Sequence, residues 1–582
     1  MVENFFFEYK RKICEEAGRL GLESFPVLTE ELFSLYEKTG NRLEYERVYF
    51  ERRKFLSVLA IAGGVSADRD GELAKQFEQK LEFVIQDICR ETTWALPAHI
   101  DRSKDGWENT IDLFAAETAF YLAEISQIHR DHLSEETVCQ VQQEVLRRVL
   151  MPFARSKRPY AFWEQCEMNW NAVCNGAIGC AALWLLQDNN MSELLEQIVN
   201  RVTENLPYYL EGFSKDGVCL EGPSYYTYGL TFYFAFCDLL QRFTGSDRDL
   251  LEHSRLEKIV VFLQKCYLPG GYTISFSDGN VQEKFRFGLQ TFMAMSFDGV
   301  ELPEVSLAAG PWDDDCYRYA TLSRDIEWTR RYLEKYGEKN TKIDVVMNEC
   351  TFSKEAVINQ RTSIDFFPDA QWAIIRRANS AIAIKGGHND EPHNHNDVGS
   401  VMYVADGNLL LTDLGAGEYT REYFGEGRYE NLCCSSVGHS VPSIDGNGQK
   451  AGKEYRATEF NQMEDSVTMS IAQAYDLQEE ESILRNVFLR AKDGGLVILD
   501  VFKLQEGRQA TENFVTPICP EELEDAFILE TSNRKYMVTC DAFTDKRIVE
   551  QNYRNHAGEE ITVWMMQWDV PLEEVKIRIK AV

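Results

Sequence analysis

The sequence lacks several features that would assign it to a class of protein at once. No stretch of its 582 residues is apolar for the length that a membrane span needs. The N-terminus, MVENFFFEYKRKICEEAG, has neither the apolar core nor the small-residue cleavage site of a signal peptide. The 15 cysteines are odd in number and scattered, without a CxxC pair, and only Cys433 and Cys434 are adjacent. These absences predict reduced thiols, no membrane association and a cytoplasmic location, with a trimmed secreted or periplasmic form as the alternative.

A surplus of basic residues is also missing. Lys and Arg number 61 against 94 Asp and Glu, so the formal net charge is -33. Binding to nucleic acid depends on cations that neutralise phosphates, and the charge therefore argues against nucleic acid as the main partner. An anionic ligand would need a locally basic site. The composition, 44% hydrophobic and 27% charged, is that of an ordinary globular protein, and the length predicts two or three domains.

The first part of the chain shows helical periodicity. Apolar residues recur at helical steps in three runs, within residues 55–61, 113–125 and 194–202. Short breakers such as Ala62-Gly63-Gly64 separate the runs, and no fixed-period repeat is present. Many amphipathic helices in series predict an α/α toroid or solenoid.

The pattern changes within residues 339–358. Beyond this stretch, β-branched and alternating runs dominate, for example at 373–375, 381–384, 401–404, 409–411, 497–499 and 561–566. Turn signals such as Asp406-Gly407-Asn408 and Asp445-Gly446-Asn447 punctuate them. The expected fold class is multidomain α+β, with an N-terminal (α/α) toroid at 1–345 followed by a C-terminal antiparallel β-sandwich at 346–582.

A histidine-rich segment gives the strongest local signal of chemistry. The chain has nine histidines, and His388, His393 and His395 fall within eight positions. In an extended segment His393 and His395 project to the same side. With Asp413 and His439 further on, these side chains predict a site for zinc or manganese, which imidazole and carboxylate ligands suit. The alternative is a polar loop whose histidines are only hydrogen-bonded.

These residues resemble a known family. The run His393-x-His395-x-Asp397, followed by Asp413-x-Gly415, Tyr419 and then His439 before Ile444-Asp445-Gly446, is similar to that of the heparinase II/III-like polysaccharide lyases. The resemblance implies an α/α toroid before an antiparallel β-sandwich. It also implies that His393 lines the active cleft, while His395, Asp413 and His439 hold one divalent metal ion. Where the family usually has His-Asn-Thr in this later strand, this chain has His439-Ser440-Val441. The departure concerns the assignment of His439 as a metal ligand.

The helical part extends the resemblance. Family members bind the uronate carboxylate with an Asn at the start of an apolar helix, where this chain has Asn169, Trp170, Asn171 and Asn175. Asn171 and Asn175 share a helical face, whereas the family register matches Asn169, with Trp170 in the place of a histidine. An asparagine at a helix start is otherwise a common cap.

The resemblance also implies a catalytic tyrosine after an E-G/P turn, and Glu221-Gly222-Pro223 precedes Tyr225. Tyr228 is the second candidate, and both could instead pack in the core. The residues expected to contact substrate are Trp170, Tyr228, Arg421, Arg428 and Tyr429.

Together these motifs predict a polysaccharide lyase that cleaves uronic-acid-containing glycans, such as hyaluronan, chondroitin or heparan sulfate, by β-elimination. Elimination needs a carboxylate clamp, a base and an acid. The Asn segment supplies the clamp and Tyr225 the acid, while the base is Tyr225 itself where the geometry is syn and His393 otherwise. The alternatives are an alginate or oligoalginate lyase, a glycoside hydrolase on the same scaffold, and a carbohydrate-binding protein without activity.

Overall fold

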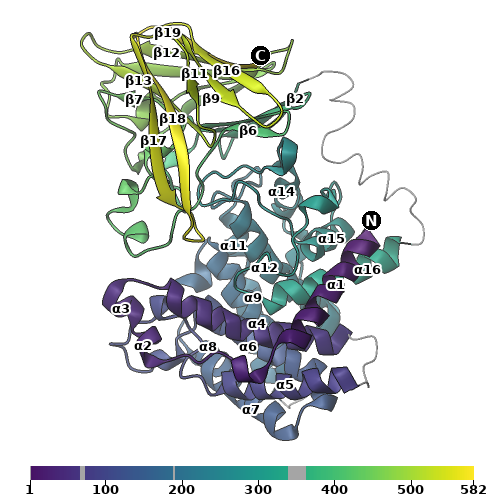
Figure 1. Cartoon of the computed structure of the whole chain (residues 1–582). Coiled ribbons are helices and arrows are strands. Elements are labelled where there is room, and N and C mark those ends of the chain that lie inside the picture. The colour runs from purple at the N-terminus through teal and green to yellow at the C-terminus, as the bar shows by residue number, and fades with distance from the viewer. Residues whose placement is uncertain (1, 66–71, 188–190, 338–361) are drawn as a thin grey trace. The chain divides into compact units, whose positions relative to one another are not determined.

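The computed structural model describes residues 2–65, 72–187, 191–337 and 362–582 (Figure 1). Contacts divide the chain into two compact units. The helical unit comprises Met1–Phe213, Tyr226–Glu257 and Lys284–Val345, and the sheet unit comprises Ser214–Tyr225, Lys258–Glu283 and Val346–Val582. The sheet unit therefore includes two short segments from earlier in the chain. The expected domain boundary at 345/346 lies outside the described residues.

The helices follow one another through the first part of the chain. Their bounds are α1 Val2–Arg19, α2 Glu30–Phe33, α3 Leu35–Thr39, α4 Leu43–Val65, α5 Glu72–Cys89, α6 Leu113–Ile128, α7 Glu135–Val145, α8 Met151–Arg155, α9 Asn169–Leu186, α10 Ser192–Asn205, α11 Pro207–Glu211, α12 Pro223–Thr244, α13 Leu256–Ile259, α14 Phe262–Lys265, α15 Phe287–Ser296 and α16 Tyr319–Tyr336. The three apolar runs expected to be helical lie in α4, α6 and α10.

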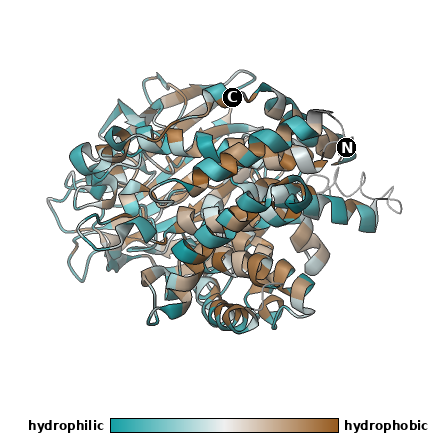
Figure 2. Cartoon of the chain, turned by 90° about the horizontal axis from the view of Figure 1, so that it is seen from below, coloured by the Kyte–Doolittle hydropathy of each residue, from teal (hydrophilic) through white to brown (hydrophobic). Residues whose placement is uncertain are grey.

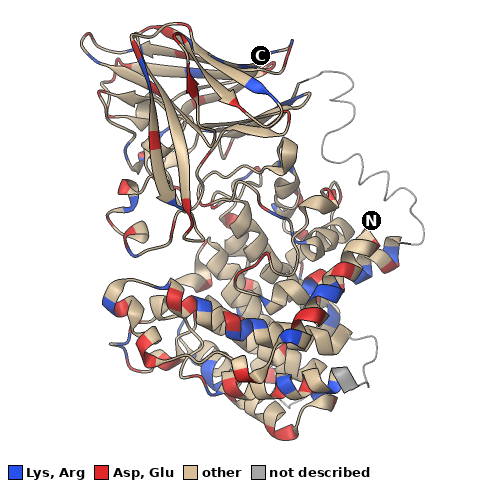
Figure 3. Ribbon diagram, viewed as in Figure 1, with Lys and Arg blue, Asp and Glu red and all other residues tan. Residues whose placement is uncertain are grey.

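Two kinds of helix build the helical unit. α6 and α9 pack against each other and are buried along nearly their whole length, which explains why both are apolar on all sides. Asp112 caps α6, accepting a hydrogen bond from the Ala115 amide at 2.8 Å. Other helices carry hydrophobic and hydrophilic residues together (Figure 2), and acidic and basic residues are interspersed along α1 and α4 (Figure 3). In α1 the charged residues leave one side for the interior, where Tyr9, Ile13 and Ala17 are buried, whereas α4 is buried on all sides from Phe55 to Gly63.

The sheet unit is antiparallel throughout its named strands. Their bounds are β1 Ser363–Phe367, β2 Trp372–Arg377, β3 Ser380–Lys385, β4 His388–Asn389, β5 Val401–Ala405, β6 Asn408–Leu411, β7 Ser443–Ile444, β8 Gly452–Arg456, β9 Thr458–Met463, β10 Ser466–Ser470, β11 Ser482–Leu489, β12 Leu496–Lys503, β13 Ala510–Thr516, β14 Glu521–Glu522, β15 Ala526–Glu530, β16 Lys535–Cys540, β17 Asp545–Arg554, β18 Glu560–Val570 and β19 Glu574–Ala581.

These strands form four sheets. The orders are β1-β2-β3-β5-β6, β14-β15-β16-β19-β12-β11-β10-β9, β17-β18-β13-β7 and β4-β8. One hydrophobic core joins the five-stranded and eight-stranded sheets, with Ile382 and Ile384 from the former beside Val487 and Ile498 from the latter. Packing of two sheets over a shared core is the arrangement of a β-sandwich.

Two predicted turns are confirmed. Asp406 and Gly407 both have positive φ angles, of 49° and 75°, and connect β5 to β6. Asp445 and Gly446, with φ angles of 52° and 73°, reverse the chain beside the Ile444–Asn447 bridge. Asp and Gly tolerate this left-handed backbone.

The predicted fold class is confirmed, since a helical region precedes antiparallel sheets. Among the described residues no helix has the length and apolarity to cross a membrane, and the cysteines described there form no disulfide.

Candidate active site

Asp278 lies at the centre of a hydrogen-bonded cluster in the sheet unit. Its side chain is fully buried. Oδ2 is 2.5 Å from His393 Nδ1 and accepts a hydrogen bond from the Tyr419 hydroxyl at 2.8 Å. Oδ1 is 3.1 Å from His395 Nε2 and accepts from the Tyr423 hydroxyl at 2.5 Å. One carboxylate thus fixes four side chains, two of which were predicted as site residues.

The surroundings of Asp278 keep its carboxylate ionised. Burial alone would raise the pKa of Asp278, but hydrogen bonds from His393 and His395 lower it well below its usual range. Burial, with the nearby Asp278 charge contributing, raises the pKa of Tyr419 and Tyr423. Both phenols therefore stay protonated, and each donates its proton to the carboxylate.

Tyr225 joins this cluster from the first turn of α12. Its ring stacks on His393, with centroids 4.4 Å apart and planes inclined by 29°. Its hydroxyl is 2.5 Å from the Tyr419 hydroxyl. Because Tyr419 already donates its only proton to Asp278, Tyr225 must be the donor in this contact. The structure thus brings the two predicted catalytic residues, Tyr225 and His393, into direct contact.

His393 lies between two carboxylates. Nδ1 donates to Asp278, so in the neutral ring Nε2 carries the lone pair, and Nε2 is 3.6 Å from Glu221 Oε2. His393 also has a φ angle of 57°, and Ser277, which precedes Asp278, has 59°. Left-handed conformations of such residues are strained and occur often at functional sites, where the surrounding structure holds them.

The Asp413-x-Gly415 motif docks on the segment that carries Asp278. Gly415 has a φ angle of 62°, and a Cβ atom added to it would lie 2.1 Å from the Gly279 carbonyl oxygen. The Ser275 hydroxyl donates to the Asp413 carbonyl at 3.1 Å. Only glycine fits at residue 415, which explains the motif: it lets the two segments approach closely.

His395, Asp413 and His439 form a group that could hold a metal ion. All three are fully buried, and one ligand atom from each lies within 4.8 Å of the others. His439 Nε2 donates to the Cys433 carbonyl at 2.8 Å, while its Nδ1 lies 2.9 Å from Asp413 Oδ2. A neutral His439 thus points a lone pair at a carboxylate, an arrangement that a cation between them stabilises.

His395 completes the same arrangement. Its Nε2 is committed to Asp278, and its Nδ1 is buried without a hydrogen-bond partner among the described residues. Metal-binding histidines commonly donate their other N–H to a carboxylate or carbonyl group, as both do here. Burial lowers the pKa of His395, but its interactions, led by the hydrogen bond to Asp278, raise it to about 10. A metal ion would displace that proton, so these residues fit a divalent cation.

The expected substrate contacts of the sheet unit lie around this cluster. Arg428 donates to the Asn394 and Tyr423 carbonyls, both at 3.0 Å, and its guanidinium lies over the Tyr423 ring. Tyr429 accepts a hydrogen bond from the Asn394 side chain at 3.3 Å. Arg421 is exposed. Arg428 and Tyr429 therefore support the loop that carries the histidines, and their contact with substrate stays a prediction.

The asparagine segment belongs to the helical unit. Asn171 and Asn175 are fully buried, and their amide groups donate to backbone carbonyls, including that of Glu164 at 2.9 and 3.2 Å. These contacts fasten the start of α9. Asn169 is also buried, and Trp170 packs against Phe162 and His99 at 5.2 and 5.0 Å between ring centroids. A role for the segment at the uronate carboxylate stays a prediction.

Tyr228 has a different environment from Tyr225. Its hydroxyl donates to the buried Glu117 at 2.5 Å, and the Arg318 guanidinium lies 4.0 Å from its ring centroid. Burial and the Glu117 charge raise the pKa of Tyr228 well above its usual value. This hydroxyl is part of the internal hydrogen bonding of the helical unit.

Sequence reasoning did not assign roles to several residues of the cluster. Tyr419 stands in a motif that carries the family resemblance, but the sequence assigned no chemistry to it or to Asp278. A buried acid between apolar residues and a tight turn, as in Phe276-Ser277-Asp278-Gly279, was the available signal. Glu221 stands in the E-G/P turn without an assigned role, and Tyr423 gave no signal beyond its nearness to the motifs.

Comparisons with known proteins agree with this architecture. Residues 359–562 match the family model described as heparinase II/III-like, C-terminal. Among solved structures, heparinase III has a TM-score of 0.60 at 13% identity, over 100% of this chain and 91% of that one. Heparan sulfate lyase HepC from Pedobacter heparinus has 0.56 at 10%, over 100% and 88%. The Streptomyces coelicolor A3 chondroitin AC lyase, in complex with chondroitin sulphate, has 0.50 at 11%, over 99% and 82%. Such identities show a shared fold. No curated protein matches the chain.

Proposed function

Through residues 359–562 the chain belongs to the heparinase II/III-like family, and from this premise we propose that it is a polysaccharide lyase. Its substrates are glycans that contain uronic acid, of the glycosaminoglycan class. The bond from C4 of the uronate to its oxygen is broken by β-elimination, which leaves a 4,5-unsaturated uronate.

The observation that carries the proposal is that Tyr225 and His393 contact each other and are both linked to the carboxylate of Asp278. Elimination transfers one proton from C5 of the uronate and one to the departing O4 oxygen. Tyr225 and His393 are stacked at 4.4 Å, and both are hydrogen-bonded, directly or through Tyr419, to Asp278. Two groups able to move a proton thus lie within reach of one sugar ring.

The geometry suggests a division of roles. Asp278 holds His393 as the tautomer with a proton on Nδ1, so that Nε2 can accept the C5 proton. A positive charge acquired in this step lies between Asp278 and Glu221. Tyr225 gives its proton to O4 as the C4–O4 bond breaks. The Tyr419 hydroxyl can then turn from Asp278 to the Tyr225 oxygen and donate its proton to it, which stabilises the phenolate until a proton returns.

An amide from the Asn169–Asn175 segment is proposed to neutralise the uronate carboxylate and so to make the C5 proton acidic. Asn169 is the best candidate, because the amide groups of Asn171 and Asn175 donate to backbone carbonyls.

His395, Asp413 and His439 would hold one divalent ion, zinc or manganese. When bound, the ion supplies positive charge that offsets the buried Asp413. His395 and Asp413 flank the segment of Asp278, so the proposed role of this site is to fix the loops around the cluster.

The test is to incubate the protein with hyaluronan, chondroitin sulfate, heparan sulfate and alginate while following ultraviolet absorbance. Elimination creates a conjugated double bond, so absorbance should rise with at least one glycosaminoglycan. A rise with alginate alone would change the substrate class. New reducing ends without absorbance would show hydrolysis and overturn the lyase proposal.

A further inference from the structure

A long hairpin of the sheet unit reaches the candidate active site. β17 and β18 pair from Asp545–Asp569 to Arg554–Glu560 without a break in register. The turn between them is closed by hydrogen bonds from the Asn555 amide to the Glu559 carbonyl and from the Gly558 amide to the Asn555 carbonyl, at 3.0 and 2.9 Å. The tip is therefore a defined turn.

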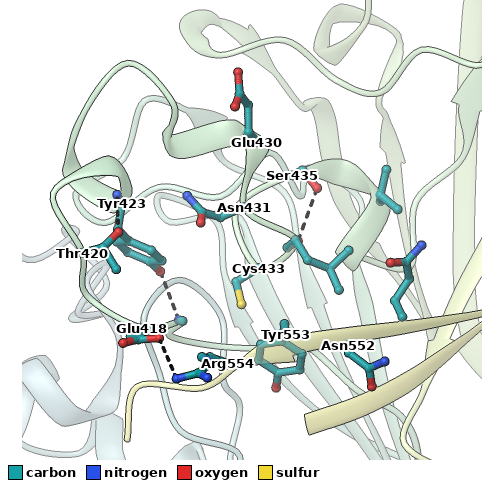
Figure 4. Close-up of a pocket in the computed structure, with 14 residues that line it drawn as sticks. Glu418, Thr420, Tyr423, Glu430, Asn431, Cys433, Ser435, Asn552, Tyr553 and Arg554 are labelled. Atoms are coloured by element: carbon teal, nitrogen blue, oxygen red, sulfur yellow. Dashed lines mark hydrogen bonds and ion pairs between the residues drawn. The ribbon is translucent and has the colours of Figure 1, made fainter. Parts of the chain in front are cut away.

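The hairpin tip is fastened to the loop that follows the metal residue Asp413. Gly417 and Asn555 form an antiparallel bridge, and the Glu418 amide donates to the Arg554 carbonyl at 3.0 Å. Figure 4 shows the Arg554 side chain pointing to Glu418, with 3.9 Å between the charged atoms. These contacts position the tip beside Tyr419, the next residue of the loop.

Two exposed aromatic rings contact Tyr419 there. His556, in the hairpin turn, lies edge-on to Tyr419 with ring centroids 4.3 Å apart and is exposed. Phe424, from the loop, also lies edge-on to Tyr419 at 4.8 Å and is 6.4 Å from His393. Phe424 is 52% exposed. Phe424 also packs edge-on against the buried Tyr423 at 5.4 Å between ring centroids, so the ring is held in place while half of its surface stays open to water.

We propose that Phe424 and His556 form a sugar-binding rim at the open side of the Tyr225–Tyr419 pair, an inference that rests on the proposed function. An aromatic ring offers an apolar face to the C–H groups of a pyranose, and an imidazole N–H donates to a hydroxyl or carboxylate oxygen. The ligand is a uronate-containing oligosaccharide, whose reacting sugar or its neighbour lies against the rim. The hairpin is the fixed wall that sets the position of His556.

The rim differs in kind from the catalytic cluster. Phe424 cannot move a proton, and His556 contacts Tyr419 through its ring. As parts of a binding rim, both side chains hold the ground state and the transition state alike, so loss of either raises KM and leaves kcat nearly unchanged.

The experiment measures kcat and KM of Phe424→Ala and His556→Ala with the glycan that the wild type cleaves fastest. We expect KM to rise by about five- to tenfold in each, the scale of one contact, with kcat within about twofold. Metal content and Tm should match the wild type. Phe7→Ala and His132→Ala, exposed residues of the helical unit, are the matched controls and should leave both constants unchanged.

Two results would overturn the rim. One is an unchanged KM in both variants; the other is a fall in kcat at constant KM, which would show that the two rings act on Tyr419 alone. If the wild type produces no unsaturated product, the proposed function fails. Calorimetric titration with hyaluronan, chondroitin and heparan sulfate oligosaccharides then tests sugar binding by the rim separately. The two variants should still bind about five- to tenfold more weakly than the wild type. Equal affinity would refute the rim.

Discussion

One buried carboxylate, that of Asp278, connects the proposed catalytic residues with the proposed metal ligands. Asp278 accepts hydrogen bonds from His393, the proposed base, and from His395, a proposed metal ligand. Through Tyr419 it also reaches Tyr225, the proposed acid. The motifs singled out these three residues as candidates, but not the acid that connects them, because Asp278 lies more than a hundred positions from the histidines and its partners meet only in the fold.

Tyr225 and Tyr228 are expected to respond differently to loss of the hydroxyl. Tyr225→Phe should fold normally and lower kcat by roughly 10²-fold or more, the scale of one general acid–base group. Tyr228→Phe removes a donor from the buried Glu117, so it should lower the free energy of unfolding by about 1–3 kcal/mol. Steady-state kinetics and denaturant titration of both variants check this. Full activity in Tyr225→Phe would remove the main support for the proposed mechanism.

The metal content of variants should distinguish the proposed metal ligands from their neighbour His393. The wild-type protein should contain close to one equivalent of zinc or manganese by elemental analysis, and His395→Ala and His439→Ala should lose it. His393→Ala should keep the metal, because its contacts are with Asp278, Glu221 and Tyr225. Equal metal content in the wild type and in His395→Ala would contradict the assignment.

Among the elements, the loop between β3 and β5 holds both histidines and is fastened by buried polar contacts. Lys385 Nζ lies 2.7 and 2.9 Å from the two carboxylate oxygens of Asp397. The Gln449 side chain accepts from the Val398 amide at 2.9 Å and donates to its carbonyl at 2.6 Å. These contacts fix the backbone at Asp397 and Val398, just after His395. They therefore help to hold the loop in which His393 keeps its strained conformation.

Breaking the ion pair should therefore destabilise the sheet unit. Lys385→Met leaves the Asp397 carboxylate buried without its partner, and the free energy of unfolding should fall by about 3–5 kcal/mol. The exposed pair of Arg534 and Asp406 serves as the control, since Arg534→Met should cost no more than about 1 kcal/mol. Urea unfolding measures both variants. An equal loss of unfolding free energy in the two would show that the buried Lys385–Asp397 pair contributes no more than an exposed pair.

The elements themselves were largely predictable. Alternating runs and Asp-Gly turns predicted strands such as β3, β5 and β18, because side-chain alternation and turn chemistry are local properties. The membership of residues 214–225 and 258–283 in the sheet unit was not foreseen. It depends on contacts such as that of Gly279 with Gly415, which join segments far apart in the chain and leave no periodic trace.

At the scale of the whole molecule, buried ion pairs accompany the large negative charge. In the helical unit, Glu164 pairs with Arg201 and Glu124 with Arg324, both at 2.6 Å and both almost fully buried. Burial raises the pKa of Glu164, but the hydrogen bonds from Arg201, the Tyr160 amide and Asn205, together with the Arg201 charge, outweigh it, and the pKa lies below its usual value. The stability that Glu164 contributes is thus present above its unfolded pKa of about 4.3 and is lost as pH falls through the folded pKa.

Arg201→Met should reverse this dependence. Without its partner, the buried Glu164 acquires a raised pKa, so the variant should be less stable than the wild type by about 3–5 kcal/mol at pH 7. The difference should shrink below about pH 5, as the carboxyl group takes up a proton. Arg330→Met removes an exposed pair with Glu334 and should change stability by less than about 1 kcal/mol at either pH. A constant difference between pH 7 and pH 4 would contradict the pairing argument.

Because the backbone of His393 is left-handed, the residue that replaces it decides whether the loop keeps its strain once the ring is removed. Glycine adopts a φ angle of 57° without strain, so His393→Gly removes the ring while relaxing the loop, whereas alanine would retain the strain. The substitution leaves a space the size of the ring between Tyr225 and Asp278. Free imidazole added to the solution should occupy that space and restore turnover in proportion to its concentration. Such chemical rescue, seen in His393→Gly but absent from Tyr225→Phe, would identify the missing ring as the group that moves the proton.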